Sequence, residues 1–115
     1  MATTTVTTEL VIRRPAGDYR AFERPATLSD QRYRLLFEPS GRGVGCWYLT
    51  IFDVLGTLLA ASIRLVPTTD LLRVLRARVP DLPTGRLRLE ATRDPELGDL
   101  ATDNVHLYYD EEIAA

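Results

Sequence analysis

Residues 31–67 read QRYRLLFEPSGRGVGCWYLTIFDVLGTLLAASIRLVP and form a dense run of large apolar side chains. At its start Tyr33, Leu35 and Phe37 alternate with charged residues, the period of two expected of a half-buried strand. Gly- and Pro-containing turns divide the run, so we predict a β-meander of three strands whose second strand holds the single Trp. The residues predicted to define the core and the fold are Tyr33, Trp47, Leu49, Ile51, Gly56 and Ile63.

The last two strands of this meander are apolar on both faces. In the second strand Trp47, Leu49 and Ile51 share one face, and the opposite face carries Tyr48, Thr50 and Phe52. An apolar face must be covered. We therefore expect a second layer, or a neighbouring subunit, against it.

The flanking segments suggest a mainly β domain. Residues 1–8 are polar and Thr-rich, and we expect a flexible N-terminal arm. Short β-prone segments occur at residues 9–13, 19–24, 86–90 and 105–109, and apolar residues recur at helical spacing over 69–79. We predict one domain over residues 9–115: an antiparallel β-sandwich or partly open barrel of about 6–7 strands with one short α-helix at 69–79.

Composition narrows the possible functions of this 115-residue chain. The net charge of −2 is too close to neutral to favour non-specific nucleic-acid binding. The chain has no Lys, which excludes Schiff-base catalysis and a Walker-type phosphate loop. The N-terminus has no signal-peptide pattern and the apolar run 58–63 is too short to span a bilayer, so we expect a soluble protein made in the cytoplasm, without a membrane partner.

No motif points to catalysis, a metal or a cofactor. With one Cys, Cys46, and one His, His106, a common zinc site cannot be built, and Cys46 is expected to be a buried thiol. Gly41, Gly43 and Gly45 lie between two predicted strands rather than before a helix, which favours a hairpin over a phosphate loop. The carboxylates after Arg93 do not have EF-hand spacing. We expect no cofactor and no enzymatic activity.

Charge is distributed unevenly along the chain. Every Arg lies at or before Arg93, and all charges beyond it are carboxylates. The Arg-rich cluster between residues 73 and 88 could bind phosphate, cover a helix face or pair across a subunit boundary. Acidic tails and basic flanks on one small domain suit head-to-tail docking in a symmetric ring. The residues expected at such an interface are Thr3, Thr5, Arg73, Arg76, Asp110 and Glu111.

The order of short motifs along the chain resembles the small baseplate plug proteins of contractile phage tails. The resemblance covers about residues 9–113 and departs at Asp30, where the family pattern tends to have Gly. The motifs are residues 31–35 (QRYRL), 47–53 (WYLTIFD), 56–59 (GTLL), 63–67 (IRLVP), 70–72 (DLL), 82–87 (LPTGRL), 97–100 (LGDL) and 105–109 (VHLYY).

This resemblance implies a structural protein of the virion without a reaction of its own. It implies a place in the central baseplate, plugging or bridging the tube end and the hub–spike complex until contraction ejects the tube. The implied partners are copies of itself and the tail tube, tube-initiator, hub and spike proteins, in a phage or a phage-tail-like injection particle.

The alternative from the residues alone is a small β-barrel that binds a ligand or single-stranded nucleic acid. Tyr33, Trp47, Tyr48 and Phe52 could then stack on bases. The near-neutral net charge offers little attraction for a nucleic-acid backbone, so we expect no stable nucleic-acid binding.

Overall fold

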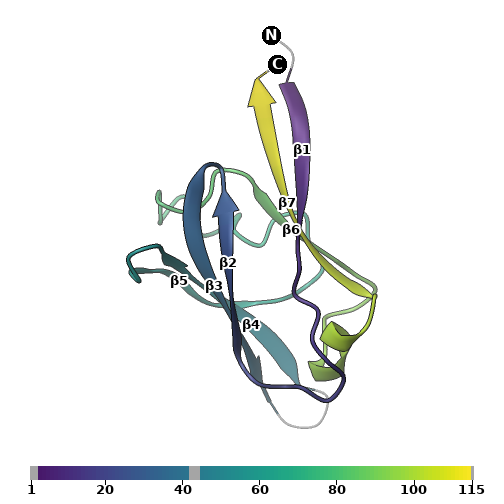
Figure 1. Ribbon diagram of the computed structural model, residues 1–115. Coiled ribbons are helices and arrows are strands. Elements are labelled where there is room, and N and C mark those ends of the chain that lie inside the picture. The colour runs from purple at the N-terminus through teal and green to yellow at the C-terminus, as the bar shows by residue number, and fades with distance from the viewer. Residues whose placement is uncertain (1–2, 42–44, 115) are drawn as a thin grey trace.

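The structure is a computed structural model of the chain, and it describes residues 3–41 and 45–114. Seven strands form two antiparallel sheets (Figure 1). The first sheet has the order β1-β7-β6 and is made of Thr3–Leu10, Val105–Ala114 and Arg86–Ala91. The second has the order β2-β3-β4-β5 and is made of Phe22–Leu28, Gln31–Ser40, Cys46–Asp53 and Leu58–Arg64. The mainly β fold and the predicted meander, β3-β4-β5, are confirmed, and the sheets do not close into a barrel.

Two tight turns shape the second sheet. Ser29 and Asp30 join β2 to β3 with φ angles of 52° and 63°, the left-handed conformation that a two-residue hairpin requires. Asp30 stands where the resembling family tends to have Gly, and Asp is among the residues that tolerate this conformation. Between β4 and β5 the Asp53 carboxylate accepts hydrogen bonds from the amides of Leu55 and Thr57, both at 2.9 Å.

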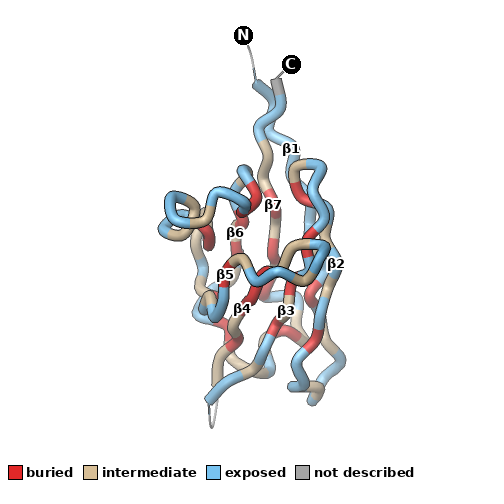
Figure 2. The backbone as a smooth tube through the Cα atoms, turned by 90° about the vertical axis from the view of Figure 1, so that its left-hand side faces the viewer, coloured by how far each residue is buried: buried red, intermediate tan, exposed pale blue. Residues whose placement is uncertain are grey.

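The core lies between the two sheets, with one face of each sheet buried (Figure 2). Phe22 stacks on Phe37 with ring centroids 4.9 Å apart and meets the edge of Trp47 at 5.7 Å. From the first sheet the fully buried side chains are Leu87 and Leu107. Strands β6 and β7 therefore cover the face that carries Trp47, Leu49 and Ile51. On the opposite face, where a further layer was expected, Thr50 is buried and Tyr48 and Phe52 are half-buried, and what covers them stays a prediction.

The α-helix predicted over residues 69–79 is wrong. This segment forms successive turns, with Arg76 N bonded to Leu72 O and Val79 N to Leu75 O, each at 3.0 Å. Its start is tied to β6 instead, because Leu71 N donates to Leu87 O at 2.8 Å. A segment this short gains little from helix propagation once its first residues are held by a strand. In the described residues the one helical element is a 3-10 turn, η1, at Leu97–Ala101.

The N-terminal segment is also more regular than expected. From Thr3 to Leu10 it is strand β1, paired with β7 from Thr3↔Ala114 to Leu10↔Leu107. The predicted boundary after residue 8 falls inside this strand, and residues 1 and 2 lie outside the described residues. In the described ranges no helix is long and apolar enough to cross a membrane.

Candidate functional site

The structure places the residues predicted to define the core at different depths. Tyr33 is 6% exposed, and Trp47, Leu49 and Ile51 are fully buried, whereas Ile63 is half-buried against the same cluster. Neither Tyr33 nor Trp47 presents a largely exposed ring. Whether they define the fold energetically remains a prediction.

Gly56 lies at the turn between β4 and β5 with a φ of 87°, a conformation that favours glycine. A Cβ there would come within 3.1 Å of Arg34 Nη2. Because the Arg34 side chain is 47% exposed and can move, the backbone conformation is the reason for glycine at this turn.

The single histidine is engaged on both ring nitrogens. His106 Nδ1 lies 2.8 Å from Glu9 Oε1, and Nε2 lies 2.6 Å from the Asp103 carbonyl oxygen. Both partners are acceptors, so only the imidazolium, with an N–H on each nitrogen, satisfies both. The hydrogen bond to Glu9 accordingly raises the pKa of His106, with the Asp103 carbonyl adding to the effect. The bond to Glu9 thus joins the His106 ring, on β7, to strand β1.

The other candidate reactive groups are not assembled into a site in the described part of the chain. Cys46 is half-buried in β4, paired with Ser40 in the β-ladder. Gly41 and Gly45 flank residues 42–44, which lie outside the described residues, in the connection from β3 to β4. No group of three or more His, Cys, Asp or Glu side chains within residues 3–41 and 45–114 could hold a metal ion.

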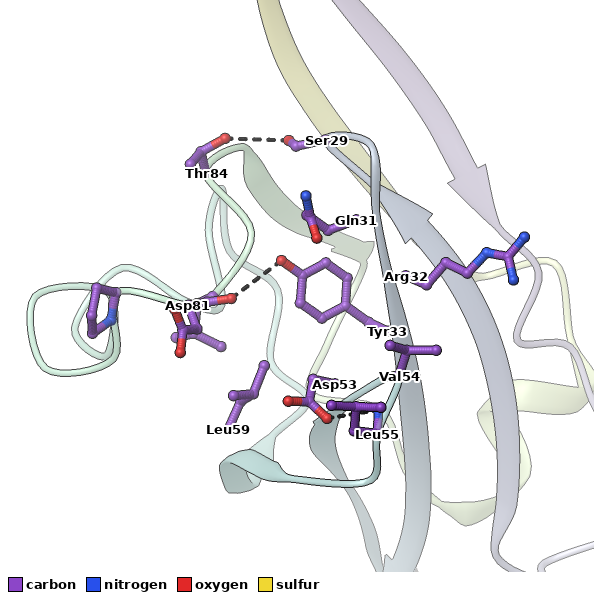
Figure 3. A pocket seen from close by; sticks show the side chains of 12 residues that line it. Ser29, Gln31, Arg32, Tyr33, Asp53, Val54, Leu55, Leu59, Asp81 and Thr84 are labelled. Atoms are coloured by element: carbon purple, nitrogen blue, oxygen red, sulfur yellow. Dashed lines mark hydrogen bonds between the residues drawn. The ribbon is translucent and has the colours of Figure 1, made fainter.

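A hollow of about 510 Å³ lies between the β4–β5 turn and residues 80–84 (Figure 3). The Tyr33 hydroxyl donates to the Asp81 carbonyl at 3.2 Å across it, and burial raises the pKa of this phenol. On its rim Val54 is 58% and Leu55 88% exposed. Val54 and Leu55 were not among the residues selected from the sequence. Two large apolar residues inside a turn indicate an exposed apolar surface, because turns lie at the surface of a protein.

The predicted interface residues divide into two groups that the structure does not bring together. Arg73 is exposed on the turns over residues 71–79, but Arg76 is engaged internally: Nη1 contacts Asp70 Oδ2 at 2.7 Å and Nη2 donates to the Gly85 carbonyl at 2.5 Å. The Asp70 carboxylate is buried, which raises its pKa. The hydrogen bonds from Arg76 and from two backbone amides outweigh this and leave the pKa lowered.

The second group lies on β1 and the C-terminal part of β7, which together form a two-stranded ribbon. Thr3 and Thr5 are on β1. Asp110 and Glu111 are on β7, where they pair with Thr7 and Val6 of β1. Asp110 accepts from Thr7 Oγ1 at 2.7 Å and from Arg88 Nε at 2.8 Å, and the Arg88 bond lowers its pKa. Glu111 and Glu112 have no ion pair among the described residues.

The ribbon projects beyond the body of the two sheets, and Thr3 is paired with Ala114 at its far end (Figures 1 and 2). Strand β6 begins at Arg86, opposite Asp110, so from Glu111 onward β7 pairs with β1 alone. Val6 and Ile113 are 44% and 46% exposed there. The sequence did not identify Val6 and Ile113 as exposed strand residues, because the segment around Val6 is mostly Thr and shows no alternation of apolar and polar residues.

The described residues form a projecting ribbon, an exposed apolar turn and a packed core. Residues 16–112 match the protein family described as "Cyanophage baseplate Pam3 plug gp18". No curated protein matches the chain. The match spans β2 to most of β7, whereas β1 lies before it. The chain therefore belongs to the cyanophage baseplate plug family and is a structural component of the tail baseplate.

Proposed function

We propose that the chain plugs or bridges the junction between the end of the tail tube and the central hub–spike complex, and that it acts without a catalytic step. The family match over residues 16–112 carries this proposal. The structure supports it with a body whose two sheets share one continuous core and with exposed features suited to contact. Contraction would then eject the tube past or together with this subunit.

The proposed neighbours are copies of the chain itself in a symmetric ring and the tube, tube-initiator, hub and spike proteins. Two exposed features could serve such contacts: the apolar β4–β5 turn, with Val54 and Leu55, and the β1–β7 ribbon. The molecule is elongated, with extents of 49 × 29 × 23 Å, so the ribbon can reach a subunit that the body does not touch. Neither membrane contact nor stable nucleic-acid binding is part of the proposal.

The test is to locate the chain in intact tails. We expect a cryo-EM map of the native particle to show the two-sheet body near the tail axis, between the tube end and the hub. A particle lacking the chain should show this density missing. Absence of the chain from purified tails, or a position at the baseplate periphery, would contradict the proposal. So would tight, steeply salt-dependent binding of single-stranded DNA by the purified chain.

A further inference from the structure

The two sheets have four outer edges, and three of them are protected against pairing with another strand. The β6 edge is covered because Thr68 and Leu89 exchange backbone hydrogen bonds at 3.1 and 3.0 Å. The β2 edge contains Pro25, which has no N–H to donate. The β5 edge is distorted by shifts in its register with β4 and by Ser62, with a φ of 55°. Proteins commonly block edge strands in these ways.

The fourth edge, β1, has none of these devices. Its eight residues pair with β7 in one continuous register and include no Pro, Lys or Arg. Five of the eight are Thr, which favours the extended conformation. Alternate residues of an antiparallel edge strand direct both backbone hydrogen-bonding groups outward. In the described residues, the β1 backbone has no hydrogen-bond partner outside β7.

The projecting part of the ribbon also lacks a third strand. A two-stranded ribbon is marginally stable by itself and is strengthened by a further strand or by packing. Val6 and Ile113 lie on the same face of the ribbon as the buried Leu107 and Tyr109 farther along β7, so they extend the core-facing surface into solvent. A strand added at β1 would widen this surface.

An apolar cleft of about 320 Å³ lies at the foot of the same edge, between the end of β1 and β2. Leu10 and Ile12 form one side and Pro25 and Ala26 the other, with the buried Phe37 among the residues that line it. Glu9 and Arg24 also line it and are its charged residues. The cleft opens where both sheets end in an edge strand. It can receive one apolar side chain from a strand laid along β1.

We propose that the free edge of β1 binds an extended segment of a different baseplate chain, which adds a third strand to the ribbon. This segment places an apolar side chain in the cleft beside Ala26 and carries basic residues. The inference rests on the proposed function and names the kind of partner that the ribbon takes. Edge-strand addition obtains its affinity from main-chain hydrogen bonds and its specificity from alternate side chains.

Two observations favour a different chain over a second copy. In an antiparallel pair of β1 strands, the described residues brought opposite the cleft would be the polar Thr3–Thr5, which leave it empty. The ribbon also carries Glu111 and Glu112 without ion pairs in the described residues and has no Arg from residue 3 to residue 10 or from 105 to 114. A second copy would bring charge of the same sign, whereas a basic segment would be attracted.

Photo-crosslinking in assembled tails tests this assignment. The full chain is produced with p-benzoylphenylalanine in place of Thr5 or of Val11, which lines the cleft and is 69% exposed, and with Thr27, exposed on β2, as the control position. We expect the first two positions to crosslink to one short stretch of the same non-identical baseplate chain, with an apolar residue near the Val11 crosslink. The Thr27 position should not reach that stretch.

Crosslinks only to a second copy, or none at Thr5 in tails that contain the chain, would overturn the inference and leave the proposed function standing. Absence of the chain from the tails would overturn both. Substitution supplies a second readout: Ala26→Leu fills the cleft, and Thr27→Leu adds the same side chain on the exposed face. With both variants folded, we expect Ala26→Leu to lower incorporation into tails about tenfold and Thr27→Leu to leave it unchanged. Equal incorporation of the two would also overturn the inference.

Discussion

Trp47 has the largest side chain among the fully buried residues of the core. Its indole Nε1 donates to the Leu97 carbonyl at 3.3 Å, so its polar atom is satisfied inside the protein. Phe22 packs against its ring, with centroids 5.7 Å apart. The residue thus joins β4 to β2 and to η1.

We predict that Trp47→Ala lowers the free energy of unfolding by about 3–5 kcal/mol, because it removes the largest buried side chain and leaves a cavity between the sheets. Chemical denaturation of both proteins measures this difference. Leu55→Ala is the control: Leu55 is 88% exposed, and its loss should change the free energy of unfolding by no more than about 0.5 kcal/mol. A Trp47→Ala protein as stable as the wild type would show that this indole does not anchor the core.

At the scale of elements, the pairing of β1 with β7 includes a side-chain contact that depends on pH. The imidazolium of His106 is bonded to Glu9 of β1 and to the Asp103 carbonyl, and its pKa is raised from the ordinary value of 6.5. A group whose pKa is raised on folding stabilises the folded state fully below its unfolded pKa. That contribution is lost as the pH rises through the folded pKa.

We therefore predict that Glu9→Gln lowers the melting temperature most near pH 6, below the ordinary pKa of 6.5, and that the difference shrinks as the pH rises through the raised pKa of His106. The effect should be small, because both side chains are partly exposed. Thermal melts of the two proteins across this range give the difference. The matched variant Glu111→Gln, also on the ribbon, should show no such pH dependence, and an identical profile for both would contradict the assignment.

At the scale of the whole molecule, the Tyr109 hydroxyl links the two sheets. Tyr109 belongs to β7, and its hydroxyl is hydrogen-bonded to Ser29 Oγ in the β2–β3 turn and accepts the Gly85 N–H at 2.7 Å. A Cβ on Gly85 would lie 2.5 Å from the Tyr109 ring, so only glycine permits this approach. The turn of one sheet is thereby fixed to the start of β6 in the other.

We predict that Tyr109→Phe lowers the free energy of unfolding by about 1–3 kcal/mol, because the half-buried Gly85 amide and the Ser29 hydroxyl each lose a partner. Unfolding should remain a single transition, since the two sheets still share one core. Tyr108→Phe is the control, because the Tyr108 hydroxyl has no hydrogen bond within the described residues. Denaturant titrations followed by Trp fluorescence measure both, and equal stabilities would exclude the inter-sheet contact as a stabilising element.

Local patterns determined a large part of this protein. The alternation around Tyr33 and Trp47 and the turn residues at Asp53 and Gly56 specify a meander, because neighbouring residues and short turns set strand faces and hairpins. The order of motifs along the chain also carried the resemblance to baseplate plug proteins, which the family match confirms.

Only the tertiary structure decided the remaining features, since they depend on partners far apart in the chain. Apolar spacing over residues 69–79 fits a helix equally well, and the contact of Leu71 with Leu87 on β6 is what replaces it with turns. The polar arm became a strand because β7, about 100 residues later, supplies its hydrogen bonds. Whether an edge is free, and whether a cleft opens beside it, depends on where every other strand ends, and no local pattern encodes that.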